Sequence, residues 1–355
     1  EAALYRLGAS LELRTNDRDD VALELLCPLP SLEPALEAIA KSLAAPAFRQ
    51  DDFERVLGEF RVAERREAGD PEARSAIALR AEAYLGHACA LPPRGTAASL
   101  GAVTREDVVR FWAEGAGAER LRVAVVGDLD PARLALALEP CLAAIPRHGA
   151  DPSPLASPSA ARDALPSPRS LAIAEALPAA AGKAFVRAEL GVPDASSPDY
   201  AALAVALAMI DDILDLGLPD RAGAIPPARA AQSSLPATGA GSAILWIPDC
   251  ADPVAARAAF RAAAELLAAG RCLDARDRGI VGDIGASLEA YRLRAVAKAY
   301  AKADGSAQLA ARIARDLAAG GDGTAFFRMA DRIAAVGAAD VARVARERLV
   351  EGPAA

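Results

Sequence analysis

The chain has 355 residues, of which 53 % are hydrophobic, and a formal net charge of −8 at pH 7. This length suits two domains with sizeable cores. The net negative charge, with Lys and Arg scattered singly or in pairs, excludes a typical nucleic-acid-binding protein. No apolar run reaches the roughly 20 residues of a membrane helix, so we expect a soluble chain.

The first half begins with a predicted β-hairpin. Residues 9–15 and 19–29 alternate apolar and polar side chains, which is typical of two antiparallel strands joined by a turn. The helical spacing of apolar residues, with residues typical of helix starts and ends, predicts helices over residues 31–46, 51–69, 70–86, 104–115 and 130–145. The expected N-caps are Asp70, Thr104 and Asp130. The apolar run 120–129 predicts a buried strand.

A proline-rich linker separates the halves. Residues 147–170 carry five prolines and five serines, a composition typical of an extended connection, and we place the linker itself at 149–170. The second half has a similar order: a strand, a long helix, a hairpin and then a helix. Their predicted bounds are 183–192 for the strand, 197–216 for the long helix, 228–237 and 241–249 for the hairpin, and 252–270 for the last helix, with further helices to the end.

The two halves also match at single residues. Cys27 and Cys250 each close a strand just before a helix. In "AVTREDVVRFW" and "AVGAADVARVA", the matched residues are Val103 with Val336, Asp107 with Asp340 and Val108 with Val341. We therefore predict an α+β chain of two tandem homologous α/β-sandwich units, 1–148 and 171–355, each with an antiparallel-rich sheet covered by helices. The first half lacks a counterpart of 183–216, so its first strands and helix are expected before Glu1.

This order of motifs resembles the pitrilysin/insulinase family of zinc metallopeptidases. The resemblance rests on "LGASLELRTNDRDDVALELL", "YLGHACALPPRGTAASLGAVTREDVVRFW", "LRVAVVGDLD" and "SPDYAALAVALAMI". It implies that two halves, each made of two α+β units, enclose a chamber. It also implies an HxxEH zinc motif with a downstream glutamate as third ligand, the motif's glutamate taking a proton from zinc-bound water. An arginine and a tyrosine of the second repeat hold the substrate in active relatives.

The sequence departs from the family's active pattern at each of these places. It contains no HxxEH, and its two histidines, His87 and His148, are 61 residues apart in predicted loops. The third-ligand position falls near Ala63 or Glu64, in a helix without the family's two glutamates seven apart. In the second half, Arg221 matches the family arginine, whereas the tyrosine position falls at Ala228.

These departures predict a non-catalytic subunit that completes a peptide-binding chamber for an active, zinc-bearing partner, or for a second copy of itself. No residue of this chain is then catalytic or metal-binding, and Arg221 and Arg229 are candidate substrate contacts. One alternative is an active zinc endopeptidase whose HxxEH lies upstream of residue 1, with Glu64 as its third ligand. Another is a structural core subunit of a larger complex. We expect a bacterial protein of the cytoplasm or periplasm.

Other conspicuous residues have simpler interpretations. His87 and Cys89 lack a third ligand nearby and are expected to be a loop and packing pair. The acidic cluster Asp211, Asp212 and Asp215 is expected at a solvated or partner-facing helix end. The glycine-rich stretch at Gly320, Gly321, Gly323 and Thr324 lacks a phosphate-loop lysine and predicts a turn between helices. The cysteines form no CxxC pair and are expected to be small apolar packing residues: Cys27, Cys89, Cys141, Cys250 and Cys272.

Overall fold

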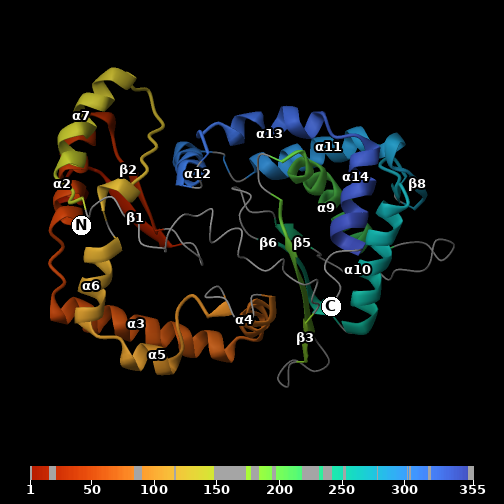
Figure 1. The fold of residues 1–355 in the computed structure, drawn as a ribbon, viewed down its shortest axis with the longest axis horizontal. Helices are drawn as coiled ribbons and strands as arrows, with labels where there is room; N and C mark the ends of the chain where they lie inside the picture. The colour runs from red at the N-terminus through yellow and green to blue at the C-terminus, as the bar shows by residue number, and fades with distance from the viewer. Residues whose placement is uncertain are drawn as a thin grey trace. The chain divides into compact units, whose positions relative to one another are not determined.

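The computed structural model is mostly helical, with small antiparallel sheets (Figure 1). It describes residues 2–15, 21–83, 90–115, 117–147, 173–176, 184–193, 197–217, 232–234, 242–250, 253–277, 279–301, 303, 305–318 and 321–350. The predicted linker, 149–170, and the turn at 16–20 lie outside these residues. No helix in the described ranges is both long enough and apolar enough for a membrane span.

The chain divides into two compact units whose boundaries do not follow the predicted halves. The first unit comprises Glu1–Arg65, Pro93–Pro158 and Ala303–Gly323. The second comprises Arg66–Pro92, Ser159–Lys302 and Thr324–Ala355. Each unit thus contains a segment from both halves, so the expectation of two tandem sandwich units is not supported.

The predicted hairpin of the first unit is confirmed. Strands β1 (Ser10–Thr15) and β2 (Val21–Leu26) pair antiparallel, with Leu11 opposite Leu25 and Leu13 opposite Leu23. Residues directly opposite each other share a face, so these leucines make one face apolar. On the other face Arg14 donates to Glu12 at 2.8 Å and pairs with Glu24 at 3.1 Å.

The predicted helices of the first unit are confirmed, and their caps explain where they begin. Asp107 N–H donates to Thr104 Oγ1 at 3.2 Å, and Ala132 N–H donates to Asp130 Oδ1 at 2.9 Å. The helices of this unit are α1 (Ala2–Arg6), α2 (Leu32–Ala44), α3 (Gln50–Gly69, within which the division falls), α5 (Ala97–Ala102), α6 (Arg105–Gly115), α7 (Pro131–Ala143) and α12 (Ser306–Ala318). The short α5 was not predicted, although Thr96 and Ser99 form a capping box at its start.

The predicted buried strand at 120–129 is wrong. Residues 121–126 pair with no strand among the described residues, and Val123 is 39 % exposed. A strand needs a neighbour to take its backbone hydrogen bonds, and in the described part of this unit β1 and β2 bond only each other. The apolar composition of 121–126 therefore does not make it a strand.

The second unit contains a four-stranded antiparallel sheet with strand order β3-β4-β6-β5. Its strands are β3 (Ile173–Ala176), β4 (Ala184–Gly191), β5 (Gln232–Ser234) and β6 (Ser242–Cys250). The predicted strand at 183–192 and the predicted hairpin are confirmed as β4 and as β5 with β6. A further hairpin, β7 (Arg271–Leu273) with β8 (Val281–Asp283), was not predicted.

The core of the second unit is built around one buried helix, α9 (Pro198–Leu216), which confirms the predicted helix at 197–216. Ser197 caps it by accepting from Asp199 N–H at 3.2 Å. Four helices contact α9 (Figure 1): α10 (Pro253–Ala268), α11 (Ile284–Tyr300), α13 (Ala325–Ala334) and α14 (Ala338–Val344). The chain continues from α14 into a π-helix, Ala345–Val350.

One helix of each unit comes from the other half of the sequence. Helix α4 (Pro71–Ala83) belongs to the second unit and lies against β3 and β4. Its predicted cap is confirmed, because Glu72 N–H donates to Asp70 Oδ1 at 2.9 Å. Helix α12 belongs to the first unit and lies against β2.

Candidate functional site

Most of the sequence-predicted site residues lie outside the described part of the chain. This holds for His87, Cys89 and His148, and also for the candidate substrate contacts Arg221 and Arg229. Their predicted roles therefore stay predictions.

The described residues do not fit a zinc site. The resemblance places the third-ligand position near Ala63 or Glu64, and both residues lie half-buried on α3. Neither histidine of the chain is among the described residues, and within those residues no three His, Cys, Asp or Glu side chains are grouped to hold a metal ion. Glu64 alone cannot bind zinc, which takes three or four protein ligands.

The acidic cluster is not solvated as predicted. Asp211 is only 8 % exposed and its carboxylate pairs with Lys298, while the half-buried Asp212 pairs with Arg294. Asp215 alone is exposed. The expectation fails for the first two because α9 is buried on nearly all sides, so adjacent acids near its end face other helices.

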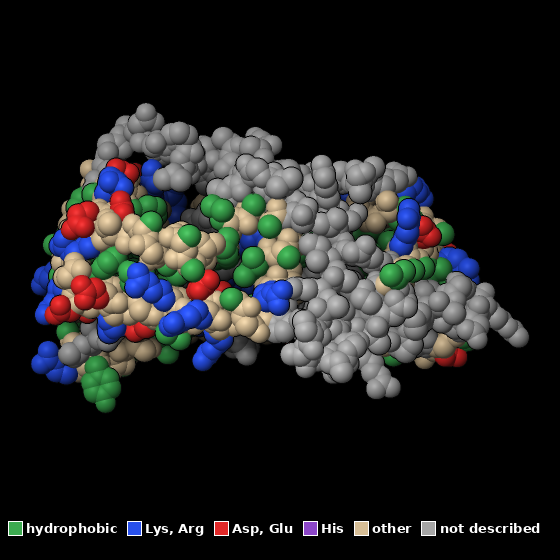
Figure 2. Space-filling model, turned by 90° about the horizontal axis from the view of Figure 1, so that it is seen from below, with side chains coloured by type: hydrophobic (Ala, Val, Ile, Leu, Met, Phe, Trp, Pro, Cys, Tyr) green, Lys and Arg blue, Asp and Glu red, His purple; other side chains and the backbone are tan. Residues whose placement is uncertain are grey.

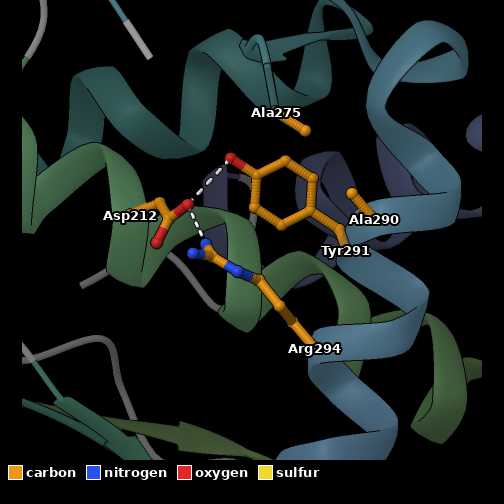
Figure 3. Close-up of a pocket in the computed structure, with 5 residues that line it drawn as sticks. All are labelled: Asp212, Ala275, Ala290, Tyr291 and Arg294. Carbon is orange, nitrogen blue, oxygen red and sulfur yellow. Dashed lines mark hydrogen bonds and ion pairs between the residues drawn. The ribbon is translucent and has the colours of Figure 1, made fainter. Parts of the chain in front are cut away.

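A small polar cavity lies beside this cluster (Figure 3). Its volume is about 40 Å³, and it is lined by Asp212, Ala275, Ala290, Tyr291 and Arg294. Tyr291 donates its hydroxyl to Asp212 Oδ2 at 3.1 Å, and the Arg294 guanidinium lies 5.6 Å from the centre of the tyrosine ring. Such a cavity holds a few water molecules, whereas ligand pockets are typically about 300 Å³ or more. The cluster therefore links α9 to α11 rather than forming a substrate pocket.

Two groups in this region, Tyr291 and Cys272, have raised pKa values. Burial, with the neighbouring Asp212 charge, raises the pKa of Tyr291, so its hydroxyl stays protonated and donates. Burial raises the pKa of the Cys272 thiol to about 11, so the thiolate nucleophile is scarce at neutral pH. Cys272 is buried, as predicted for a packing residue, and Cys27 and Cys141 are half-buried with pKa values raised by burial.

The glycine-rich stretch is a turn, as predicted, in its described part. It connects α12 to α13, and Gly321 N–H donates to the carbonyl of Asp316 at 2.8 Å. Gly323 has a φ of +77°, a conformation that favours glycine.

The described surface also lacks a strongly basic patch on the face shown in Figure 2. Lys and Arg side chains alternate there with Asp and Glu side chains over the described residues. Nucleic-acid binding requires a concentration of positive charge, so this face offers no support for such a partner.

The arrangement of helices and small sheets is that of the M16, or pitrilysin, peptidases, and it covers nearly the whole chain. The resemblance inferred from the sequence is thus confirmed at the level of the fold. No family model and no curated protein matches the sequence itself.

Three solved structures illustrate the similarity. The peptidase M16 inactive domain from Pseudomonas fluorescens superposes with a TM-score of 0.69 at 14 % identity, over 98 % of this chain and 79 % of that one. A protease from Helicobacter pylori gives 0.69 at 15 % identity, over 98 % and 81 %. A chain of complex III2 from Candida albicans, with Inz-5 bound, gives 0.67 at 14 % identity, over 96 % and 79 %. At these identities the similarity describes the fold alone.

Proposed function

We propose that this chain is a non-catalytic subunit of a heterodimeric zinc metallopeptidase, where it completes a peptide-binding chamber for an active partner that carries the zinc. The observation that carries the proposal is the histidine content. Residues 1–355 contain two histidines, 61 positions apart, and so lack the pair of imidazoles one helical turn apart that the family's metal site uses. The fold of an inactive M16 domain is compatible with such a role.

The segment that would contact peptide in the second half supports the same proposal. Ala228 stands where active relatives have a tyrosine, so no phenol is available there to stabilise a developing oxyanion. We propose that Arg221 and Arg229 contact bound peptide, because a guanidinium donates in a fixed fork to carboxylates and carbonyl groups. Their role is then to hold the peptide rather than to cut it.

The experiment is reconstitution with the partner. The chain purified together with its partner from the source cell should cleave peptides, while the chain alone should not. Replacing both Arg221 and Arg229 by Gln should raise the KM of the complex with little change in kcat. The double replacement of Arg55 and Arg110, which form exposed ion pairs on α3 and α6, is the matched control. Unchanged KM in the Arg221 and Arg229 variant would remove the peptide-contact proposal.

Two other candidate functions have specific support. Glu64, which with Ala63 is one of two candidates for the third-ligand position, is half-buried on α3, and a glutamate there is compatible with an active peptidase if HxxEH lies upstream. The similarity to a chain of complex III2 favours a structural subunit without a peptide. Stoichiometric zinc would identify the first, and a complex that binds no peptide in titration would identify the second.

We also propose that the two halves of the sequence are copies of one ancestral unit. The matched residues have equivalent hydrogen bonds: Thr104 N–H donates to Asp107 Oδ2 at 3.0 Å, and Gly337 N–H donates to Asp340 Oδ2 at 2.9 Å. Helix α4, which follows α3, belongs to the second unit, and helix α12, which follows α11, belongs to the first unit. Independent tandem units would not exchange corresponding helices, so we propose that the two copies fold as interdependent units.

A further inference from the structure

The segment that carries α12 departs from the second unit along the chain and then returns to it. Residues up to Lys302 and from Thr324 onward belong to the second unit, whereas Ala303–Gly323 belongs to the first. Within the first unit, α12 lies against β2. Both ends of the segment therefore join helices of the second unit, α11 and α13, while its own helix packs in the first. We call Ala303–Gly323 the α12 arm.

The two ends of the α12 arm are held together by contacts within the second unit. Tyr300, the last residue of α11, donates its hydroxyl to the carbonyl of Phe326 at 3.0 Å, and the two ring centres lie 4.6 Å apart. Phe326 in turn packs edge-on against Phe327, with ring centres 5.6 Å apart. Arg292 Nε donates to the carbonyl of Val336 at 2.9 Å, so α11 is also bound to the residues after α13. The root of the arm is thus closed by groups that lie outside the arm.

The α12 arm itself buries little. Its apolar residues Leu309, Ile313 and Leu317 are four positions apart, which places them on one face of the helix. All residues of α12 are described, and each of them is half-buried or exposed. By comparison, α13 contributes Met329 and Ile333 to the buried core. Because hydrophobic stabilisation grows with the apolar area removed from water, α12 loses less on leaving its site than α13 would.

Glycines lie just outside both ends of α12. Gly305 directly precedes the helix, and Gly321 and Gly323 follow it. A Cβ at Gly323 would lie 3.3 Å from Ile313 Cγ2, so the turn after the helix folds closely against the apolar face of α12. A backbone without Cβ absorbs large changes in φ and ψ at low cost, which is typical of hinge positions.

We propose that the α12 arm opens and closes as a unit: α12 leaves β2, while Tyr300 and Phe326 keep the root closed and the second unit stays folded. Elements with few buried contacts open at a lower free energy than the core. The closed root means that opening does not require α11 to separate from α13. Opening uncovers β2, whose Leu23 is already 37 % exposed when the arm is in place. The arm therefore controls how much apolar surface the first unit presents, whether or not the chain is catalytic.

Amide hydrogen exchange of the unsubstituted protein tests the proposal directly. Protection factors over α12 should be at least about tenfold lower than those over α11 and α13. Trypsin should cleave the native protein at Arg312 or Arg315, within α12, before it cleaves at Arg292 or Arg343 in the helices around α9. Equal protection of α11, α12 and α13 would overturn the proposal, because the three helices would then open only together.

A pair of substitutions separates opening of the arm from general destabilisation. Leu309→Asp and Gln308→Asp place the same charge near the start of α12, but Gln308 is exposed and only Leu309 lies on the apolar face. Leu309→Asp should lower protection over α12 at least about tenfold further, and lower that of β2 with it. The Phe327 amide, which donates to the carbonyl of Thr324 at 3.0 Å, should keep its protection.

Gln308→Asp should have none of these effects. Equal effects of the two substitutions would overturn the proposal, as would a loss of protection over α11 and α13 that matches the loss over α12. None of these results depends on peptide cleavage or on a partner, so failure here is distinct from failure of the proposed function.

Discussion

The replacement Arg294→Met tests whether the ion cluster holds α9 to α11. Arg294 donates to Asp212 and lies over the Tyr291 ring at 5.6 Å. A hydrogen bond between charged groups contributes about 1.5–3 kcal/mol, and the lower end applies because the Arg294 side chain is 37 % exposed and screened by solvent. The cation–π contact adds about 0.5 kcal/mol. We therefore expect a loss of about 2 kcal/mol in the free energy of unfolding.

Urea denaturation at pH 7, followed by circular dichroism, measures this loss. The matched control is Arg261→Met, which removes an i,i+4 ion pair with Glu265 that is exposed on both sides. The control should lose less than about 0.5 kcal/mol. A double-mutant cycle with Asp212→Asn should give a coupling energy of about 1 kcal/mol or more. The reasoning is refuted if Arg294→Met and Arg261→Met are equally mild, or if the coupling energy is zero.

Three further predictions follow from groups in the second unit. The Arg343 guanidinium donates a hydrogen bond of 2.6 Å to Asp199 and holds the pKa of that carboxyl below its ordinary value. The pair therefore stabilises the fold fully above the unfolded-state pKa of about 4. This stabilisation is lost as pH falls through the lower, folded-state pKa. Asp199→Asn should thus reduce stability at pH 7 and flatten its decline in acid, as measured by melting temperature between pH 2 and 7. Cys272 should react with iodoacetamide at pH 8 only after unfolding, which mass spectrometry of the labelled protein can check, and labelling of the native protein would count against its burial. Leu203→Ala should cost about 2–5 kcal/mol in urea denaturation because Leu203 is fully buried in α9, and a cost below 1 kcal/mol would contradict that core.

Local features of the fold could be predicted from the sequence. Asp70, Thr104 and Asp130 each accept a backbone hydrogen bond at the start of the predicted helix, because capping depends on residues two or three positions apart. The hairpin of β1 and β2 could also be predicted, because the alternation of apolar and polar residues determines which face of a strand packs.

Features that depend on distant partners could not be predicted. The run at 121–126 has the composition of a strand but no neighbour among the described residues. The acids of α9 meet Arg294 and Lys298 from a helix more than 80 residues later, and nothing local distinguishes such a pair from a solvated one. Arg294 and Lys298 lie four positions apart on one face of α11, but this spacing is equally common on solvated helix faces.

Our central proposal is that this polypeptide carries no zinc centre of the M16 type. Zinc bound to the complete natural polypeptide, measured by mass spectrometry after purification in zinc-containing buffer, tests this most directly. We predict well below one zinc per chain, and the same value for the Glu64→Gln variant. One zinc per chain that is lost on Glu64→Gln, together with peptide cleavage by the chain alone, would contradict the account.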